Sequence, residues 1–321
     1  MNLRTALPVL ALAAAMSLPM AAADPTMLKA VMPDAEFVAG ADIDKVMNSP
    51  FGQFALSKIG AEEQKLQKMI EMTGFDPRRD LREVLVASKG MGGGKDHAVI
   101  MARGTFDTAK LTAAASLHGA ALNSYNGVTI FALNPKKESE GIVALLSGIA
   151  IGGPAEDVKA TVDRIQSGKS EPPAITAQAD AASAKWDAWA VSNGSPAKFA
   201  GAVSNPNLGG ALKGEVLQGI TQSSAGVKFG ANVEIGGEAV MRSEQDAAAL
   251  VDVYKFLMSM VQMNAPKTGA VSSPIQSLFG SANVTTSGVT VKFTAQMPQS
   301  ELEKLFLMGG RHARAELRRR H

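Results

Sequence analysis

The sequence predicts an α+β protein of two similar halves, each with antiparallel strands and with helices packed on one face. Three observations lead to this prediction. Short apolar or alternating segments, typical of strands, are interspersed with helical patterns that begin at capping residues. A segment rich in small residues and proline, Ser167 to Pro173, divides the chain near its middle. Similar short words also recur on either side of that segment.

The first residues have the pattern of an export signal. Met1 to Arg4 carries one positive charge, Ala6 to Leu18 is an apolar run, and Ala21 to Ala23 supplies small residues before Asp24. A signal peptidase recognises this combination, so we expect export and cleavage after Ala23. The apolar run is shorter than the roughly 20 residues that a membrane-spanning helix needs. We therefore predict a soluble mature protein that is periplasmic or secreted.

Composition narrows the class of protein further. The chain contains no cysteine, which excludes disulfides, thiolate chemistry and a lipid-modified cysteine anchor. Of its 32 Lys and Arg residues, five lie in the last eleven positions. The stretch from Asp24 to Gly310 carries 26 basic and 29 acidic residues, a formal net charge of −3. The folded body is therefore not expected to bind nucleic acid.

We divide the chain into four parts: a signal peptide (1–23), a first α+β half (24–170), a second α+β half (171–310) and a basic tail (311–321). The length of the mature chain suits about two domains of roughly 150 residues. Phe106-Asp107 and Gln245-Asp246 each precede a predicted helix, and Gly-Val-Thr occurs at both Gly127 and Gly288. These correspondences favour an internal duplication.

In the first half, alternation and apolar runs predict several strands. They are Glu36 to Ile43, Glu83 to Ser88, Ala98 to Arg103, Val128 to Leu133, and Ile142 to Ile151 as one buried strand or a tight pair about Ser147-Gly148. Helices are expected where capping residues precede helical spacing. They begin at Pro50 with Ser49 as N-cap, and span Glu62 to Met72, Thr108 to Leu117 after Asp107, and Ala155 to Gln166.

The second half is expected to repeat this order in outline. The predicted helices are Ile175 to Ala184, one near Leu212 to Gln222, one from Asp246 as its cap to Asn264, and Ser300 to Met308. The predicted strands are Trp186 to Asn193, Val227 to Ile235, Glu238 to Ser243 and Val289 to Gln296.

Two motifs resemble catalytic sites only in part. The glycine loop from Gly90 to Lys95 lacks the frame of a phosphate-binding loop and connects two strands, so we interpret it as a hairpin tip. Ser195 and Lys198 form an S-x-x-K pair, and Lys267 begins a K-T-G word. Together they resemble penicillin-recognising serine enzymes, in which a lysine helps to deprotonate a serine nucleophile. The third motif of that class is missing between them, which favours chance.

Metal and cofactor chemistry is not expected. The four histidines have no metal-ligand spacing, and the methionines Met258, Met260 and Met263 of one predicted helix lie on different sides of it. Packing in a core is the better explanation for these methionines.

Two arginine-rich segments are candidates for binding. Arg78 and Arg79 follow Asp76-Pro77 and could hold an anion, unless neighbouring acids pair with them and make the turn a structural clamp. The basic tail could attract an anionic surface or could be a solvated end. Its arginines are Arg311, Arg314, Arg318, Arg319 and Arg320.

Several words resemble a group of secreted bacterial proteins of unknown function. The most specific is T-G-F-D-P-R-R-D-L-R-E-V-L-V-A-S, which begins at Thr73; others are N-S-P-F-G-Q-F at Asn48, Y-N-G-V at Tyr125, D-A-W-A-V at Asp187 and V-K-F-G-A at Val227. The resemblance covers most of the mature chain but not the basic tail. It implies no activity, cofactor or catalytic residue.

The sequence therefore predicts an exported, non-enzymatic binding protein or envelope-associated protein with an unknown ligand. An envelope protein or an anionic surface is the expected partner. A serine hydrolase of the envelope that uses Ser195, and an interaction module that uses the edges of its sheet, remain the alternatives.

Overall fold

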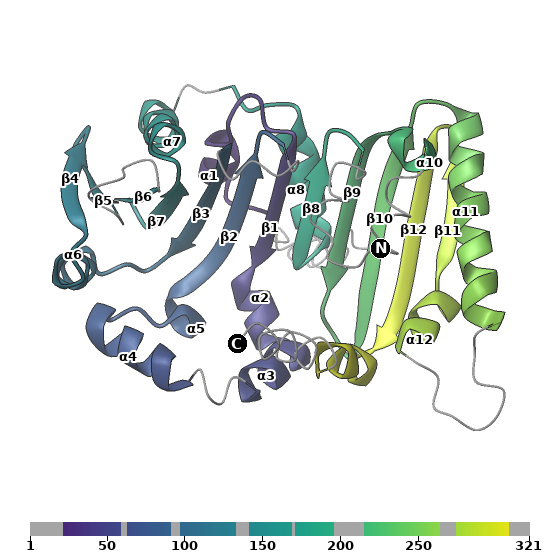
Figure 1. Cartoon of the computed structure of the whole chain (residues 1–321), viewed down its shortest axis with the longest axis horizontal. Coiled ribbons are helices and arrows are strands. Elements are labelled where there is room, and N and C mark those ends of the chain that lie inside the picture. Colours follow the sequence, from purple (N-terminus) through teal and green to yellow (C-terminus); the bar gives the residue numbers. More distant parts are fainter. Residues whose placement is uncertain are drawn as a thin grey trace, which may run out of the picture.

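The structure is a computed structural model, and it describes residues 22–58, 63–90, 97–132, 141–168, 171–195, 215–263 and 274–307. All strands in these ranges belong to one antiparallel sheet with the order β11-β12-β10-β9-β8-β1-β2-β3-β7-β6-β5-β4 (Figure 1). The strands are β1 Phe37–Asp42, β2 Leu81–Ser88, β3 Ala98–Gly104, β4 Ala121–Tyr125, β5 Val128–Ala132, β6 Ile142–Leu146, β7 Ile149–Gly153, β8 Ala188–Ser192, β9 Ile220–Lys228, β10 Asn232–Met241, β11 Asn283–Ser287 and β12 Thr290–Pro298.

Helices border this sheet along both of its long sides and at its ends (Figure 1). They are α1 Pro25–Lys29, α2 Ile43–Asn48, α3 Pro50–Ser57, α4 Glu63–Thr73, α5 Pro77–Asp80, α6 Thr108–Leu117, α7 Ala155–Ser167, α8 Ile175–Lys185, α10 Glu215–Gln218, α11 Glu244–Met263, α12 Pro274–Gly280 and a final helix at 299–307. The predicted α+β class is confirmed. Within the described ranges, no helix combines the length and apolarity needed to cross a bilayer.

The first half of the sheet has its main core on the side of α1, α7 and α8. Val38 of β1 and Leu85 of β2 are fully buried there against helix residues such as Val162 and Ile175. We call this side of the sheet the α8 face. Apart from the exposed Arg82, every residue of β1 and β2 is buried or partly buried, and the stretch Val84 to Ala87 is continuously apolar.

The second half has its core on the opposite side. Cross-strand pairing places Val191, Ser224, Glu238 and Lys292 on the α8 face, in line with Val38. The neighbouring residues of these strands point the other way, and they pack with α11 in a second core. This core contains Ile220, Ala239, Met241, Ala247, Leu250, Val251, Val284 and Val291. We call that side the α11 face. The second half thus has helices on both faces, since α8 packs on the α8 face of β8 and β9 and α11 packs on the α11 face.

The two halves share one sheet because β8 pairs with β1. Phe37 lies opposite Ser192 and Ala41 lies opposite Ala188 in an antiparallel register. Helix α8 follows residue 170 in sequence, but its residues Ile175 and Ala179 are buried in the core of the first half. The predicted boundary at 170 therefore divides the sequence without dividing the sheet.

Most predicted elements of the first half are confirmed. Ser49 caps α3, since its hydroxyl accepts a hydrogen bond of 3.0 Å from the Gly52 N–H. The apolar run at Ile142 is a tight pair of strands, β6 and β7, which turns at Ser147 and Gly148, both with positive φ. Strand β4 was not predicted. Of the glycine loop from Gly90 to Lys95, all residues after Gly90 lie outside the described ranges.

The predicted strands Val227 to Ile235 and Glu238 to Ser243 have different bounds in the structure, where Gly236 and Gly237 lie inside the single strand β10. The hairpin between β9 and β10 has its turn at residues 229–231, directly after Lys228. The indole of Trp186 lies flat on the sheet, and a Cβ on Gly236 would come within 2.9 Å of it. A Cβ on Gly237 would lie 2.4 Å from the carbonyl oxygen of Ser224. Glycine is needed at these two positions because the Trp186 side chain and the Ser224 backbone come too close for a Cβ.

Two helix predictions in the second half also need correction. Ser243, not Asp246, caps α11, since its hydroxyl accepts a hydrogen bond of 3.1 Å from the Asp246 N–H. Asp246 occupies the third helical position, where an acid also stabilises a helix start. The helix expected up to Gln222 ends at Gln218 in α10, and β9 begins at Ile220.

Both Gly-Val-Thr words occupy comparable places. Gly127 and Gly288 each lie in the turn of a hairpin, β4-β5 and β11-β12, and both glycines have positive φ. Each hairpin forms one edge of the sheet and follows a helix in sequence, α6 or α11 with α12. The duplication stays a prediction, and this arrangement is consistent with it.

The close contact of Trp186 with the backbone at Gly226 can be tested through its effect on stability. A Cβ on Gly226 would lie 2.1 Å from Cγ of Trp186, so Gly226→Ala should lower the free energy of unfolding by about 1–3 kcal/mol, the usual range of an overpacked site. Gly280→Ala is the control, because a Cβ there meets no atom within 4 Å. Urea denaturation of both variants measures the difference. Equal stabilities would contradict the proposed contact.

Candidate functional site

The charged turn at Arg78 and Arg79 is internally paired. Arg78 bonds to Asp76 through Nε (2.9 Å) and Nη2 (2.9 Å), and Nη1 lies 3.0 Å from Glu63 of α4. Arg79 makes a two-point contact with Asp80, at 2.8 and 2.9 Å. These ion pairs form the structural clamp that was one of the two alternatives for this turn. They join α4 and α5 to the start of β2. Anion binding at these arginines stays a prediction.

The pairing shifts the ionisation of both acids. The side-chain hydrogen bond from Arg78 is the main reason that the pKa of Asp76 lies below its ordinary value. The hydrogen bond from Arg79, followed by the one from the Asp76 N–H, lowers the pKa of Asp80. Both carboxylates therefore stay charged into acid, and the clamp persists there.

Ser195 and Lys198 are not seen as a catalytic pair. The Ser195 hydroxyl lies 2.6 Å from the carbonyl oxygen of Leu217 and donates a hydrogen bond to it. Lys198 and the K-T-G word at Lys267 lie outside the described residues, as do the five arginines of the tail. The hydrogen bond that Ser195 makes therefore gives no support to the alternative of a serine hydrolase.

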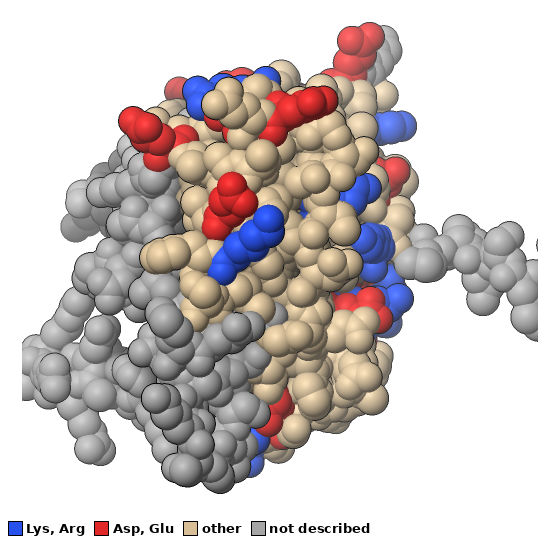
Figure 2. Space-filling view, turned by 90° about the vertical axis from the view of Figure 1, so that its right-hand side faces the viewer, with Lys and Arg blue, Asp and Glu red and all other residues tan. Residues whose placement is uncertain are grey.

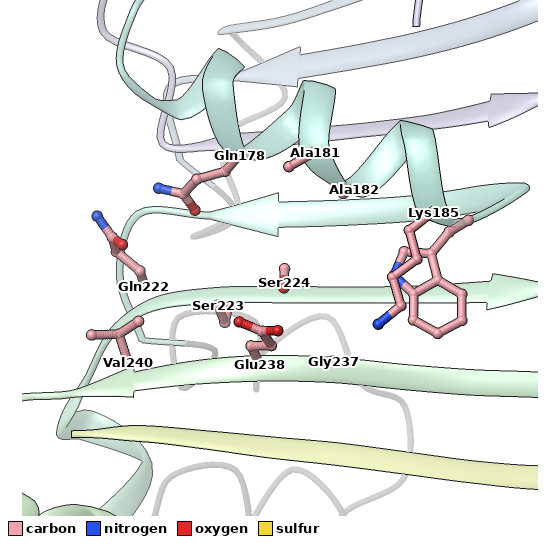
Figure 3. Close-up of a pocket in the computed structure, with 11 residues that line it drawn as sticks. Gln178, Ala181, Ala182, Lys185, Gln222, Ser223, Ser224, Gly237, Glu238 and Val240 are labelled. Carbon is pink, nitrogen blue, oxygen red and sulfur yellow. The ribbon is translucent and has the colours of Figure 1, made fainter. Parts of the chain in front are cut away.

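A groove on the α8 face brings together polar residues that the sequence did not single out. It is a cavity of about 230 Å³ between α8 and the strands β9 and β10. In Figure 3, Gln178 and Lys185 reach down from α8, while Glu238 stands up from β10 and Gln222 and Ser224 come from β9. Trp186, the residue after α8, forms one wall.

Trp186 is held rigidly in this wall. It is 6% exposed, and it covers the backbone at Gly226 and Gly236 so closely that no side chain fits between. The ammonium of Lys185 lies 4.5 Å from the ring centroid, within the range of a cation–π contact. Trp189 packs in the same manner over Gly40 of β1. The α8 end of the groove is thus a fixed aromatic surface.

The polar groups of the groove differ in how much the fold uses them. The amide of Gln178 donates to Asn193 at 3.1 Å, which orients it. Glu238 forms an ion pair of 3.2 Å with Lys292 across β10 and β12, and both side chains are about half exposed. An exposed pair of this kind contributes little to stability, so Glu238 can take part in binding at low cost to the fold.

This groove lies where helix packing passes from one face of the sheet to the other, from α8 on the α8 face to α11 on the α11 face. Helix α8 ends over β8 and β9, and beyond it the α8 face of β10 and β12 consists of polar residues such as Glu234, Glu238 and Lys292. The one sequence signal that could have located the groove is Trp186 with the glycines of β9 and β10. Strand pairing was needed to bring them together.

Comparisons with known proteins bear on the fold. No family model matches the chain, and no curated protein matches it. Two solved structures are similar over 87% of this chain at 10% sequence identity: "Structure of crystal form III of TP0453" (TM-score 0.51, 96% of that chain) and "Structure of crystal form IV of TP0453" (TM-score 0.52, 95% of that chain). At this identity the likeness shows a shared fold alone.

The clamp gives a test in acid. Because the pKa of Asp80 is lowered in the folded state, its contribution to stability is present above the unfolded value near 4 and is lost as the pH falls through the folded value. Asp80→Asn should therefore be less stable than the parent at pH 7, and this difference should shrink as the pH falls below about 4. Asp44→Asn, which breaks an exposed pair with Arg82, is the control and should change little. Thermal unfolding across pH measures both, and parallel profiles would contradict the role of Asp80.

Proposed function

We propose that the protein is an exported, non-catalytic binding protein, and that the groove between α8 and β9-β10 holds its ligand. The observation that carries this proposal is the convergence of amide, hydroxyl, carboxylate and ammonium groups from three elements on one open groove beside a fixed indole. Sites for small polar ligands commonly combine a few such groups with an aromatic wall.

The chemistry of the lining indicates the class of ligand. Gln222 and Gln178 offer amides, Ser224 offers a hydroxyl, and Glu238 lies within one groove with the opposite charge of Lys185. The groove therefore favours a neutral molecule that carries hydroxyl and amide groups, such as an N-acetylated amino sugar.

The expected export of the protein places this proposal in the periplasm or outside the cell. The signal pattern at 1–23 and the absence of cysteine suit a periplasmic or secreted protein. In that compartment the basic tail would add attraction to an anionic envelope surface, which is the association that we propose for the full chain.

The groove is testable by fluorescence, since both tryptophans of the chain lie in or next to it. Titration with an N-acetylglucosamine disaccharide should change the emission of Trp186 in a saturable manner. Glu238→Gln should weaken binding by about ten- to a hundred-fold, because a hydrogen bond to a charged group contributes roughly 1.5–3 kcal/mol.

Glu234→Gln is the matched control, because Glu234 lies on the same strand and the same face but does not line the groove. A signal that Glu234→Gln and Glu238→Gln reduce equally would contradict the assignment of the groove. Covalent labelling of Ser195 by a fluorophosphonate or β-lactam probe would contradict the non-catalytic part of the proposal.

A second candidate function is strand-mediated binding of a protein partner. Strand β11 is one edge of the sheet, and next to it α11 exposes Phe256 (62%) and Val253 (38%). Figure 2 shows this side of the molecule, where charged residues of both signs are scattered over an otherwise uncharged surface. An extended peptide could pair with such an edge while an apolar side chain contacts α11.

Phe256→Ser tests this second candidate. The unaltered chain is used to capture a partner protein from an envelope extract. If β11 and α11 form the binding surface, the Phe256→Ser variant should no longer capture this partner. Leu117→Ser, which changes an apolar residue of α6 that is 86% exposed, should retain it. Equal retention by both variants would exclude α11 from the interaction.

A further inference from the structure

The segment just before α1 is anchored in the fold by its backbone. The Ala23 N–H donates a hydrogen bond of 2.8 Å to the Ser183 hydroxyl of α8. The Asp24 nitrogen lies 3.1 and 3.2 Å from the two carboxylate oxygens of Glu83 in β2. Ala23 and Glu83 are both buried. The peptide bond at which we expect the signal to be cut therefore joins two residues held by the folded protein.

Glu83 lies in a site that is short of positive charge. Asp42 of β1 is its neighbour in the sheet, and the carboxylate of Asp24 is also close. Arg103 of β3 faces both acids, with Nε 3.4 Å from Asp24 and 3.7 Å from Glu83. Lys45 of α2 pairs with Asp42 at 3.2 Å. Among the described residues these three carboxylates thus share two cations, since the nearby Arg82 pairs with Asp44 at 2.9 Å.

Burial adds to this imbalance. Loss of hydration is the main reason that the pKa of Glu83 is raised, and the hydrogen bond from Asp24 and the charge of Arg103 offset it only in part. A further cation at the Asp24 nitrogen would act on the same carboxylate at hydrogen-bond distance, in surroundings where charges interact more strongly than in water.

We propose that cleavage of the signal peptide supplies this cation, so that the new amino terminus of Asp24 forms a buried ion pair with Glu83. The inference rests on the export that we propose above. Hydrolysis adds water across the Ala23–Asp24 bond: the hydroxyl group goes to the carbonyl carbon of Ala23, and a hydrogen goes to the nitrogen of Asp24. That amine then takes a proton from solvent, because its ordinary pKa is about 8.

The geometry needs no rearrangement for this step. The nitrogen that becomes the ammonium already points at Glu83, and the Asp24 carboxylate already caps α1 by accepting from Thr26 N–H at 2.7 Å. Departure of Ala22 and Ala23 adds their space to a cavity of about 310 Å³, which Trp186 and Trp189 also line. Processing would thus lock α1 against β2 and open the cavity beside it.

Two recombinant chains separate this effect from other consequences of the cut. One begins at Asp24, after release from a fusion by a protease that leaves no extra residue. The other begins at Ala22, so that its ammonium is two residues away at an exposed position. Each is made with Glu83 and with Glu83→Gln, and thermal unfolding is followed between pH 4 and 10. The cycle isolates the coupling between the amino terminus and the carboxylate.

The direction with pH follows from the two groups. Pairing raises the folded pKa of the ammonium, so its contribution is complete below about pH 8 and is lost as the pH rises above that. Pairing also lowers the pKa of Glu83 relative to the chain that begins at Ala22. We expect the midpoint of the Asp24 chain, relative to the Ala22 chain, to be about 3–6 °C higher at pH 6 than at pH 10. With Glu83→Gln this pH dependence should disappear.

Superimposable pH profiles for the two Glu83 chains would overturn the ion pair. If Glu83→Gln does not fold, acylation of the α-amine decides instead: the amine of Asp24 should react several-fold more slowly at pH 7 than that of Ala22, and equal rates would overturn the proposal. Amino-terminal sequencing of the exported protein tests processing separately. A start at any other residue overturns the maturation step, whereas retention in the cytoplasm overturns the proposed export; the recombinant pair still measures the contact itself.

Discussion

The contact between Trp186 and the backbone of β9 and β10 is the constraint on which the arrangement of the two halves depends. The indole occupies the space that side chains at Gly226 and Gly236 would fill. It therefore ties the end of α8 to strands of the second half, while α8 itself is buried in the core of the first. Trp189 repeats this contact over Gly40. Two tryptophans and three glycines thus allow one sheet to continue through the junction.

The same junction explains where polar residues gather. Strands β1 and β2 are covered to some degree on both sides, and they contain few polar residues between their ends. Strands β10 and β12 alternate, with Glu234, Glu238 and Lys292 on the uncovered face. Where α8 stops, the α8 face changes from core to surface within two strands. A groove with one apolar wall and several polar groups is the direct result.

Local chemistry predicted much of the fold, because caps, turns and apolar runs are written in neighbouring residues. Ser49 before Pro50 and the turn at Ser147-Gly148 are of this kind. The continuous strand through Gly236 and Gly237 was not predicted, because Trp186, which these glycines accommodate, is distant in sequence and becomes a neighbour only through strand pairing. The candidate site failed to stand out for the same reason. Glu238 and Gln222 belong to no motif, whereas Arg78 and Arg79 form a motif but are paired with Asp76 and Asp80.

Four phenylalanines connect the beginning and the end of the described chain. Phe51 of α3 stacks on Phe229 of the β9-β10 turn, with ring centroids 5.4 Å apart, and meets Phe306 of the final helix edge-on at 5.8 Å. Phe54 completes the cluster. Contacts between residues so far apart in sequence raise the contact order, and such proteins fold slowly. Since Phe306 lies in the final helix, this cluster is complete only when that helix has joined the fold.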